Sequence, residues 1–158
     1  MATLRRATPE DAKALTRLRG LMHESMGAEL SDVWRERCEA AFARRLTTEE
    51  FVAFVVEDDG EVVSGGAGWL EEHLPSPYLL DPRRGHIASM STEPTHRRRG
   101  YARLVFEALL GWFGERDIAR IDLRATDDGQ PLYESFGFRT LGGATMAWFA
   151  EGGRAGMG

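Results

Sequence analysis

The segment from His86 to Arg116 constrains the fold more than any other part of this chain. Residues 86–93 have the composition of a strand, and Pro94 stops it because proline has no backbone N–H to donate. From Tyr101 onward, apolar residues recur at spacings of three and four, which is the pattern of an amphipathic helix. That apolar face consists of Leu104, Val105, Ala108, Leu109, Trp112 and Phe113. The segment therefore predicts a strand, an arginine-rich turn and a long helix in succession.

The residues before this segment predict two helices and three strands. Thr8-Pro9 combines an N-cap hydroxyl with proline at the first helical position, so a helix should begin there and run to about Met26. Ser31-Asp32 caps a second helix. Its apolar stripe, interpreted as core, consists of Trp34, Cys38, Ala41, Phe42 and Leu46. The expected strands are residues 3–7, 51–57 and 61–70, the last two joined by a hairpin turn at Asp58-Asp59-Gly60.

Glycines stand out in the third of these strands. Gly65, Gly66 and Gly68 would weaken strand pairing unless a bulge or a close approach of another segment requires them. After the long helix, residues 120–125 predict a fifth strand, and Pro131 opens a short helix that Gly137 ends. A last pair of strands is expected at residues 138–140 and 144–149.

Composition and charge limit the classes of protein to which this chain can belong. The 158 residues suit one domain, residues 1–150, followed by a glycine-rich tail at 151–158 that we expect to be flexible. A net charge of −5 argues against non-specific nucleic-acid binding, which needs a broad basic field. No apolar run suggests a membrane span or a signal peptide, so a cytoplasmic location is expected. The four histidines show no metal-ligand spacing, and no metal is predicted.

The turn Arg97-Arg98-Arg99-Gly100 has the features of an anion site. The first turn of a helix has free N–H groups and a partial positive charge. Gly100 lets the backbone approach a phosphate closely, Ala102 leaves the helix start unobstructed, and guanidinium groups add forked donors. A pyrophosphate would fit, although three arginines can also be a solvated charge run. By contrast, Arg83-Arg84-Gly85 leads into a strand and offers no helix N-terminus.

Two motifs in this region resemble those of the GNAT superfamily of acetyl-CoA-dependent acetyltransferases. The family's phosphate-binding pattern is Arg or Gln, two residues, Gly, one residue, then Gly or Ala, and Arg97, Gly100 and Ala102 match it. The second signature resembles residues 132–138, Leu-Tyr-Glu-Ser-Phe-Gly-Phe, in which the tyrosine, here Tyr133, lies near the thioester sulfur.

The resemblance implies a fold and a set of binding residues. The fold is an α/β three-layer α-β-α sandwich with a mixed, mostly antiparallel sheet of about six to seven strands, opened between the fourth and fifth strands. Acetyl-CoA would enter that cleft, with its pantetheine arm along residues 89–92. Many family members have an asparagine after the fifth strand, where this chain has Thr126-Asp127 instead. The implied cofactor-binding residues are Ser91, Thr92, Arg97, Arg98, Arg99, Gly100, Tyr101, Ala102, Thr126 and Tyr133.

The resemblance also implies direct attack of a neutral amine on the thioester in a ternary complex. The backbone N–H of Thr92 is the expected donor to the developing oxyanion. Tyr133 is the candidate general acid for the departing thiolate, with a core tyrosine as the alternative. For the base, Glu72 is the candidate retained, together with its neighbours Glu71 and His73. His86 and Glu24 are further candidates.

Several readings of the function stay open from the sequence. A small-molecule primary amine is the first choice of acceptor, and a peptide or protein amine is the second. A non-catalytic acyl-CoA-binding sensor would keep the cleft without the chemistry, and residues 97–103 could instead contact nucleic acid. A homodimer is compatible with the sequence, which contains no dedicated motif for recognition of the acceptor.

Overall fold

The computed structural model describes residues 1–150 and divides into two compact units, residues 1–124 and the residues from 125 onward. The elements of the first unit are β1 (Ala2–Arg6), the short 3-10 helix η1 (Pro9–Asp11), α1 (Ala12–Ser25), α2 (Asp32–Arg45), β2 (Phe51–Asp58), β3 (Glu61–Glu72), β4 (Arg83–Thr92), the 3-10 helix η2 (Pro94–His96), α3 (Tyr101–Gly114) and β5 (Ile121–Leu123). The helices begin where the sequence predicted: Thr8 and Asp11 form a capping box, and the Ser31 hydroxyl accepts from the Trp34 amide at 3.1 Å.

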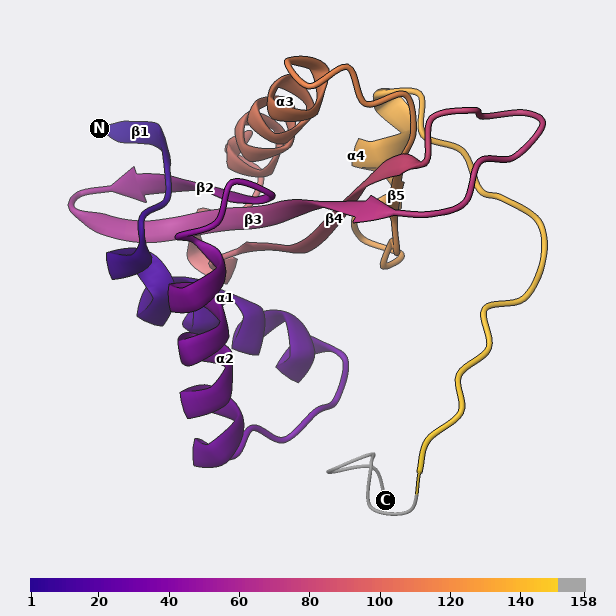
Figure 1. Cartoon of the computed structure of the whole chain (residues 1–158). Coiled ribbons are helices and arrows are strands. Elements are labelled where there is room, and N and C mark those ends of the chain that lie inside the picture. The colour runs from indigo at the N-terminus through magenta and orange to yellow at the C-terminus, as the bar shows by residue number, and fades with distance from the viewer. Residues whose placement is uncertain (151–158) are drawn as a thin grey trace. The chain divides into compact units, whose positions relative to one another are not determined.

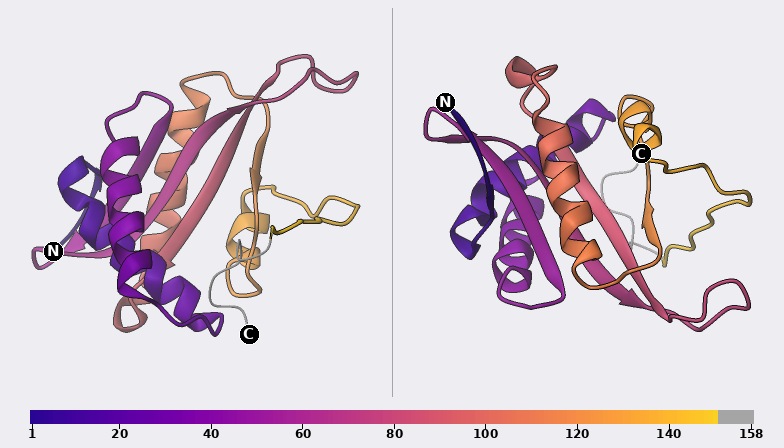
Figure 2. Two further views of the ribbon diagram at one scale, coloured as in Figure 1. Left: turned by 60° about the horizontal axis from the view of Figure 1, so that its bottom comes forward. Right: turned by 90° about the horizontal axis from the view of Figure 1, so that it is seen from above.

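The first unit is a mixed sheet with helices on both faces. The strand order is β1-β2-β3-β4-β5, antiparallel throughout except for the parallel pair β4 and β5. Helices α1 and α2 lie on one face and α3 lies on the other (Figure 1). Figure 2 shows the same division of helices from two further directions. The predicted three-layer α/β fold is therefore confirmed.

The two sheet faces bury different side chains because neighbouring residues of a strand alternate between faces. Toward α1 and α2, Phe51, Ala53 and Val55 of β2 join a core. This core also contains Leu15, Leu18, Phe42 and Ala67. The alternate residues of β2 are turned to α3, whose inner side chains Val105, Phe106, Leu109 and Phe113 are fully buried.

Glycines let α3 lie close to the sheet. A Cβ on Gly68 would come within 3.0 Å of the Phe113 ring, and one on Gly85 within 2.6 Å of it. Gly65 instead faces α1, where a Cβ would lie 3.2 Å from Leu15. The glycines of β3 thus serve close approach of helices on both faces, one of the two explanations that the sequence left open.

The second unit contains a single helix among its described residues, α4 (Gln130–Ser135), which ends before Gly137 with φ of 89°. The predicted final strands at 138–140 and 144–149 are wrong, since no strand forms there and the sheet has five strands. Their alternating apolar pattern supplies strand propensity, but a strand also needs a partner for its backbone groups. The predicted flexible tail, 151–158, lies outside the described residues.

Residues 1–150 lack two features that mark other classes of protein. Every helix there is too short or too polar to cross a membrane. In the same part of the chain, no three His, Cys, Asp or Glu side chains come together as a metal-holding group.

The contact between Gly85 and α3 gives a stability prediction. Gly85→Ala should lower the free energy of unfolding by about 1–3 kcal/mol, because the new methyl group overlaps the fully buried Phe113 ring. Gly111→Ala is the matched control, since a Cβ there meets nothing within 4 Å, and it should stabilise α3 by about 0.5–1 kcal/mol. Urea unfolding of the two variants measures both effects, and an equal response would contradict the close packing.

Candidate functional site

The outer edge of β4 is open over its second half. The parallel pairing with β5 ends at Ile87 and Leu123, whereas β4 continues to Thr92. Within residues 1–150 no strand pairs with residues 88–92 on the β5 side. A bulge accompanies this change: Ser89, with φ of 62°, lies where the register between β3 and β4 shifts. Such a bulge bends the strand and redirects its side chains.

The backbone of Thr92 points to this open side. The Glu93 amide donates to the Val63 carbonyl at 2.8 Å, so Val63 and Glu93 form a hydrogen-bonded pair. The adjacent pair, Ser64 and Thr92, must then be a non-hydrogen-bonded one, because the two kinds alternate in an antiparallel ladder. The N–H and C=O of Thr92 are therefore directed away from β3. In agreement, Arg97 Nε donates to the Thr92 carbonyl at 3.3 Å.

The turn into α3 has the backbone shape of an anion site. Arg98 and Gly100 both adopt left-handed conformations, with φ of 63° and 82°. Left-handed residues in a tight turn can direct successive N–H groups toward one point. Gly100 is the N-cap of α3, and no side chain caps the helix there. The amides of the first helical turn are thus left for a ligand, at the positive end of the dipole.

A half-buried carboxylate holds this turn against the β2–β3 hairpin. Asp58 Oδ2 accepts a hydrogen bond from the Tyr101 hydroxyl at 3.2 Å. The same oxygen lies 3.6 Å from His96 Nε2 and 3.6 Å from Arg99 Nη1. The Asp58 side chain is only 14% exposed, so these contacts are partly shielded from water. Asp58 therefore fixes both sides of the Arg97–Gly100 turn.

The residues proposed from the sequence fall into two groups. Ser91, Thr92 and the range 97–102 lie together in the first unit, at the end of β4 and the start of α3. Thr126 and Tyr133 belong to the second unit. There the Thr126 hydroxyl accepts from the Gly129 amide at 3.2 Å, in the turn that leads into α4.

Tyr133 is buried, with 8% of its surface exposed. Within the second unit its ring lies 6.5 Å from that of Phe138, and a Cβ on Gly129 would come within 3.2 Å of its hydroxyl. Burial raises the pKa of the Tyr133 phenol above its usual value. The phenol is consequently a hydrogen-bond donor across the physiological pH range.

A polar cluster lies at the other end of the β3–β4 pair, on the α2 face. Glu71 accepts from Trp69 Nε1 at 3.1 Å and from His73 Nε2 at 3.0 Å, and its carboxylate lies 3.8 Å from His86 Nδ1. The hydrogen bond from His73, aided by Trp69 and by the charges of both histidines, holds the pKa of Glu71 below its usual range, although desolvation opposes this. Glu71 is therefore a stable anion beside two imidazoles.

Glu72 is not part of this cluster. Because it follows Glu71 in the strand, its side chain leaves the opposite face of the sheet, and it is exposed. Sequence reasoning did not identify Asp58 as a site residue, and no local signal could have done so, since it meets Tyr101 across 43 positions. It was interpreted only as part of a hairpin turn.

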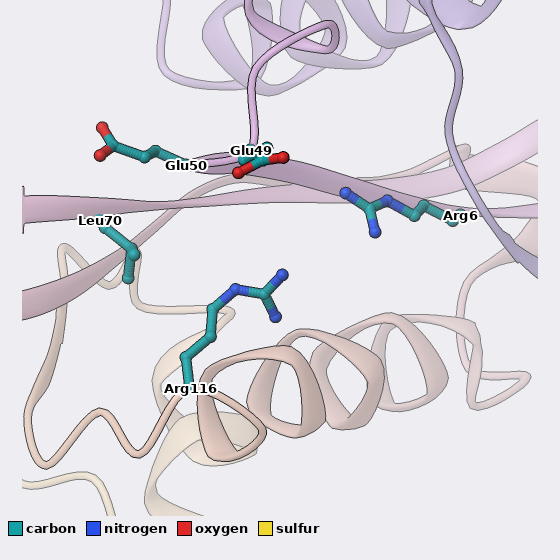
Figure 3. A pocket seen from close by; sticks show the side chains of 5 residues that line it. All are labelled: Arg6, Glu49, Glu50, Leu70 and Arg116. Atoms are coloured by element: carbon teal, nitrogen blue, oxygen red, sulfur yellow. The ribbon is translucent and has the colours of Figure 1, made fainter.

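A cavity of about 570 Å³ lies elsewhere in the first unit. It is lined by Arg6, Glu49, Glu50, Leu70 and Arg116. Figure 3 shows the Arg6 and Arg116 side chains extending into the space between the sheet and the end of α3. This end is the negative pole of the helix, about 20 Å from the Arg97–Gly100 turn. The cavity is thus separate from the anion site.

Comparisons with known proteins agree on one family. The model of the acetyltransferase (GNAT) family matches residues 18–138. An uncharacterized N-acetyltransferase, YsnE, of Bacillus subtilis (strain 168) is 34% identical over 79 residues, which are 47% of this chain and 48% of that protein. The matched stretch thus spans about half of that relative.

Solved structures extend the similarity to nearly the whole chain. A predicted acetyltransferase from Clostridium acetobutylicum, crystallised with acetyl-CoA, is 25% identical with a TM-score of 0.84, covering 93% of this chain and 96% of that one. A GCN5-related N-acetyltransferase from Ralstonia eutropha JMP134 is also 25% identical, with a TM-score of 0.80 and coverages of 94% and 99%.

The Asp58 contacts predict that substitution of this residue, which lies in the β2–β3 hairpin, makes the Arg97–Gly100 turn more mobile. Asp58→Ala should speed amide hydrogen exchange at Leu104, whose N–H donates to the Gly100 carbonyl, and lower the free energy of unfolding by about 1–2 kcal/mol, because three polar groups lose their shared acceptor. Asp59→Asn is the control, since it removes an equal charge from the same hairpin at a 93% exposed position. Unchanged exchange in Asp58→Ala would show that the turn holds its shape without the carboxylate.

Proposed function

The chain belongs to the acetyltransferase (GNAT) family and is an acyltransferase, and from this premise we propose that it transfers the acetyl group of acetyl-CoA to a primary amine of a small molecule. We treat residues 1–150 as one functional domain, because the family match at 18–138 runs across both units. The observation that carries the proposal is the uncapped start of α3 beside the open edge of β4.

Acetyl-CoA would use both of these features. The amides at the start of α3 and the guanidinium group of Arg97 or Arg98 would bind its diphosphate. The open edge of residues 88–92 would hydrogen-bond the pantetheine arm, as a strand binds an extended peptide. With the diphosphate at the start of α3, next to the end of β4, an arm paired along residues 88–92 would carry the thioester toward the Ser89 end of this edge. The acetyl-CoA complex of the Clostridium acetobutylicum protein supports this assignment.

The reaction is a direct acyl transfer. The lone pair of a neutral amine attacks the thioester carbonyl, a carbon–nitrogen bond forms, and the carbon–sulfur bond breaks with its electron pair left on sulfur. The nitrogen loses one proton and the sulfur gains one, so the products are an N-acetylated amine and CoA. An edge N–H that faces the thioester would donate to the oxyanion that develops on the carbonyl. Thr92 has an outward-pointing N–H, but it lies at the diphosphate end, so a residue nearer Ser89 suits this role better. Positioning of the two substrates supplies much of the acceleration.

Two groups would transfer the protons that the nitrogen loses and the sulfur gains. The Tyr133 phenol would donate to the departing thiolate. Because burial raises the pKa of this phenol, a strong hydrogen bond to the sulfur is favoured at least as much as complete transfer of the proton. For the amine proton, the Glu71 cluster suits the task better than exposed Glu72. His86, beside the Glu71 carboxylate, is the proton acceptor we propose, because a neutral imidazole nitrogen can accept a proton from an amine, directly or through water.

A ligand comparison tests the proposal directly. Acetyl-CoA at about a hundred times its dissociation constant should stabilise the fold by about 2.7 kcal/mol and raise Tm by roughly 5–10 °C. NAD and ATP should raise it much less, because they lack the pantetheine arm. Stabilisation by acetyl-CoA without release of CoA thiol across a broad panel of amines would identify a sensor instead of an enzyme. Equal stabilisation by all three ligands would contradict the assignment.

The role of Tyr133 predicts a selective loss of turnover. Tyr133→Phe should lower kcat by about 100-fold or more, because the thiolate loses its proton donor, while the dissociation constant for acetyl-CoA stays nearly the same. Tyr78→Phe removes a hydroxyl from a tyrosine that is 98% exposed and serves as the control. Steady-state kinetics and calorimetry provide the two measurements, and unchanged kcat would remove Tyr133 from the mechanism.

A further inference from the structure

A second cavity of the first unit, of about 200 Å³, lies on the sheet face covered by α1 and α2. The side chains that matter here are Arg19, Cys38, Arg45, Phe51, Trp69 and Ser89. Ser89 lies at the end of the open edge that is farther from the Arg97–Gly100 turn, where the thioester is proposed to lie. A molecule seated in this cavity can therefore bring a nitrogen to the thioester.

Two unpaired cations face this cavity. Arg19 and Arg45 are both half-buried, and within residues 1–150 neither forms an ion pair with a carboxylate. Desolvation, followed by the charge of Arg44, lowers the pKa of Arg45, so its charge is held in an unfavourable environment. A bound anion would offset that cost. Guanidinium groups bind carboxylates with paired hydrogen bonds and are suited to this task.

Aromatic rings fix the Arg45 guanidinium in place. Its central carbon lies 4.5 Å from the centre of the Phe51 ring and 4.6 Å from that of Trp69. The two rings are themselves stacked, 5.9 Å apart with an interplanar angle of 14°. The group is therefore held before a ligand arrives, which reduces the entropy lost on binding. The same rings offer an apolar wall to the body of the ligand.

The proton acceptor lies at the far side of Trp69. The Trp69 ring is 4.7 Å from that of His86, which in turn lies beside Glu71. The cavity thus has two cations beside an aromatic wall, and an anion with imidazoles lies behind that wall. A molecule with a carboxylate for the arginines and an amino group for the thioester fits this arrangement. The cavity volume is smaller than the roughly 300–1,000 Å³ of pockets for drug-sized ligands.

We propose that the acceptor is a free amino acid with an apolar side chain, whose carboxylate binds Arg19 and Arg45 and whose amino group lies at the Ser89 end of the cavity. The inference rests on the proposed function and adds the substrate class to it. Arg19 and Arg45 are then determinants of specificity, and the aromatic wall selects the side chain.

Cys38 provides a test that needs no catalysis, because it is the chain's only cysteine and lines this cavity. L-phenylalanine should slow modification of Cys38 by Ellman's reagent, whereas L-phenylalaninamide and 2-phenylethylamine, which lack the carboxylate, should not. In assays with acetyl-CoA, kcat/KM for L-phenylalanine should exceed that for the two analogues by about 10- to 100-fold, the range for a hydrogen bond to a charged group. 2-Aminoethyl phosphate tests whether a different anion is preferred.

Arg45→Gln should reduce both the protection and kcat/KM for L-phenylalanine by a similar factor. Arg44→Gln is the matched control, because it removes the same charge from the neighbouring, exposed position of α2. If Arg45→Gln does not fold, Arg19→Gln is the second variant to test. Acetyl-CoA stabilisation is measured in every variant, and its absence in the native protein would overturn the proposed function itself.

Three results, obtained while acetyl-CoA still binds, would contradict the proposed acceptor without contradicting the proposed function. These are equal use of L-phenylalanine and the two analogues that lack its carboxylate, a preference for 2-aminoethyl phosphate, and Arg45→Gln behaving like Arg44→Gln. Absence of acetylation of any amino acid tested would also overturn it.

Discussion

The close packing of α3 on a strip of glycines is the contact on which the rest of the structure depends. Gly68 and Gly85 leave room for the Phe113 ring, so the helix lies flat against β3 and β4. That packing sets where the helix begins, beside the end of β4. Because the amides of a helix N-terminus form an anion site only where the helix starts, the position of α3 determines the position of the site.

The sheet separates the groups that suit acetyl-CoA from those that suit an acceptor. On the α3 side and at the open edge of β4 lie the groups that suit acetyl-CoA, which are backbone amides, arginines and an outward-pointing N–H at Thr92. On the α1 and α2 side lie an aromatic wall, two arginines and the Glu71 cluster, which suit an acceptor. The bulge at Ser89 lies between them, in the strand that both sides share. One strand can thus present a thioester to a nucleophile held on the other face.

Local patterns predicted most of the elements, because helix caps, apolar periodicity and hairpin turns act over a few residues. The hydroxyl cap at Ser31 and the start of α3 after Gly100 are examples. The turn at residues 97–100 could also be found, since its chemistry lies in consecutive residues. The predicted strands at 138–140 and 144–149 failed for the opposite reason, because pairing depends on a partner that sequence propensity does not supply.

The sequence also did not predict the contacts between residues that are far apart along the chain. Neither the Asp58 anchor nor the cluster of Trp69, Glu71 and His86 follows from spacing along the chain, because folding alone brings β2 to the α3 turn and β3 to β4. Leu104 shows a smaller discrepancy: it belongs to the apolar stripe of α3, yet it is 39% exposed. Periodicity gives the direction of a helix face, and packing decides where that face ends.

The central claim is that main-chain amides at the start of α3 bind the diphosphate of acetyl-CoA. Titration of nitrogen-15-labelled protein with acetyl-CoA, followed by amide chemical shifts, tests it most directly. The account predicts that the largest shifts fall on residues 98–102, with further shifts at residues 89–92 that are absent when the titrant is adenosine 3′,5′-bisphosphate. Saturable binding that leaves the amides of 98–102 unmoved would contradict it.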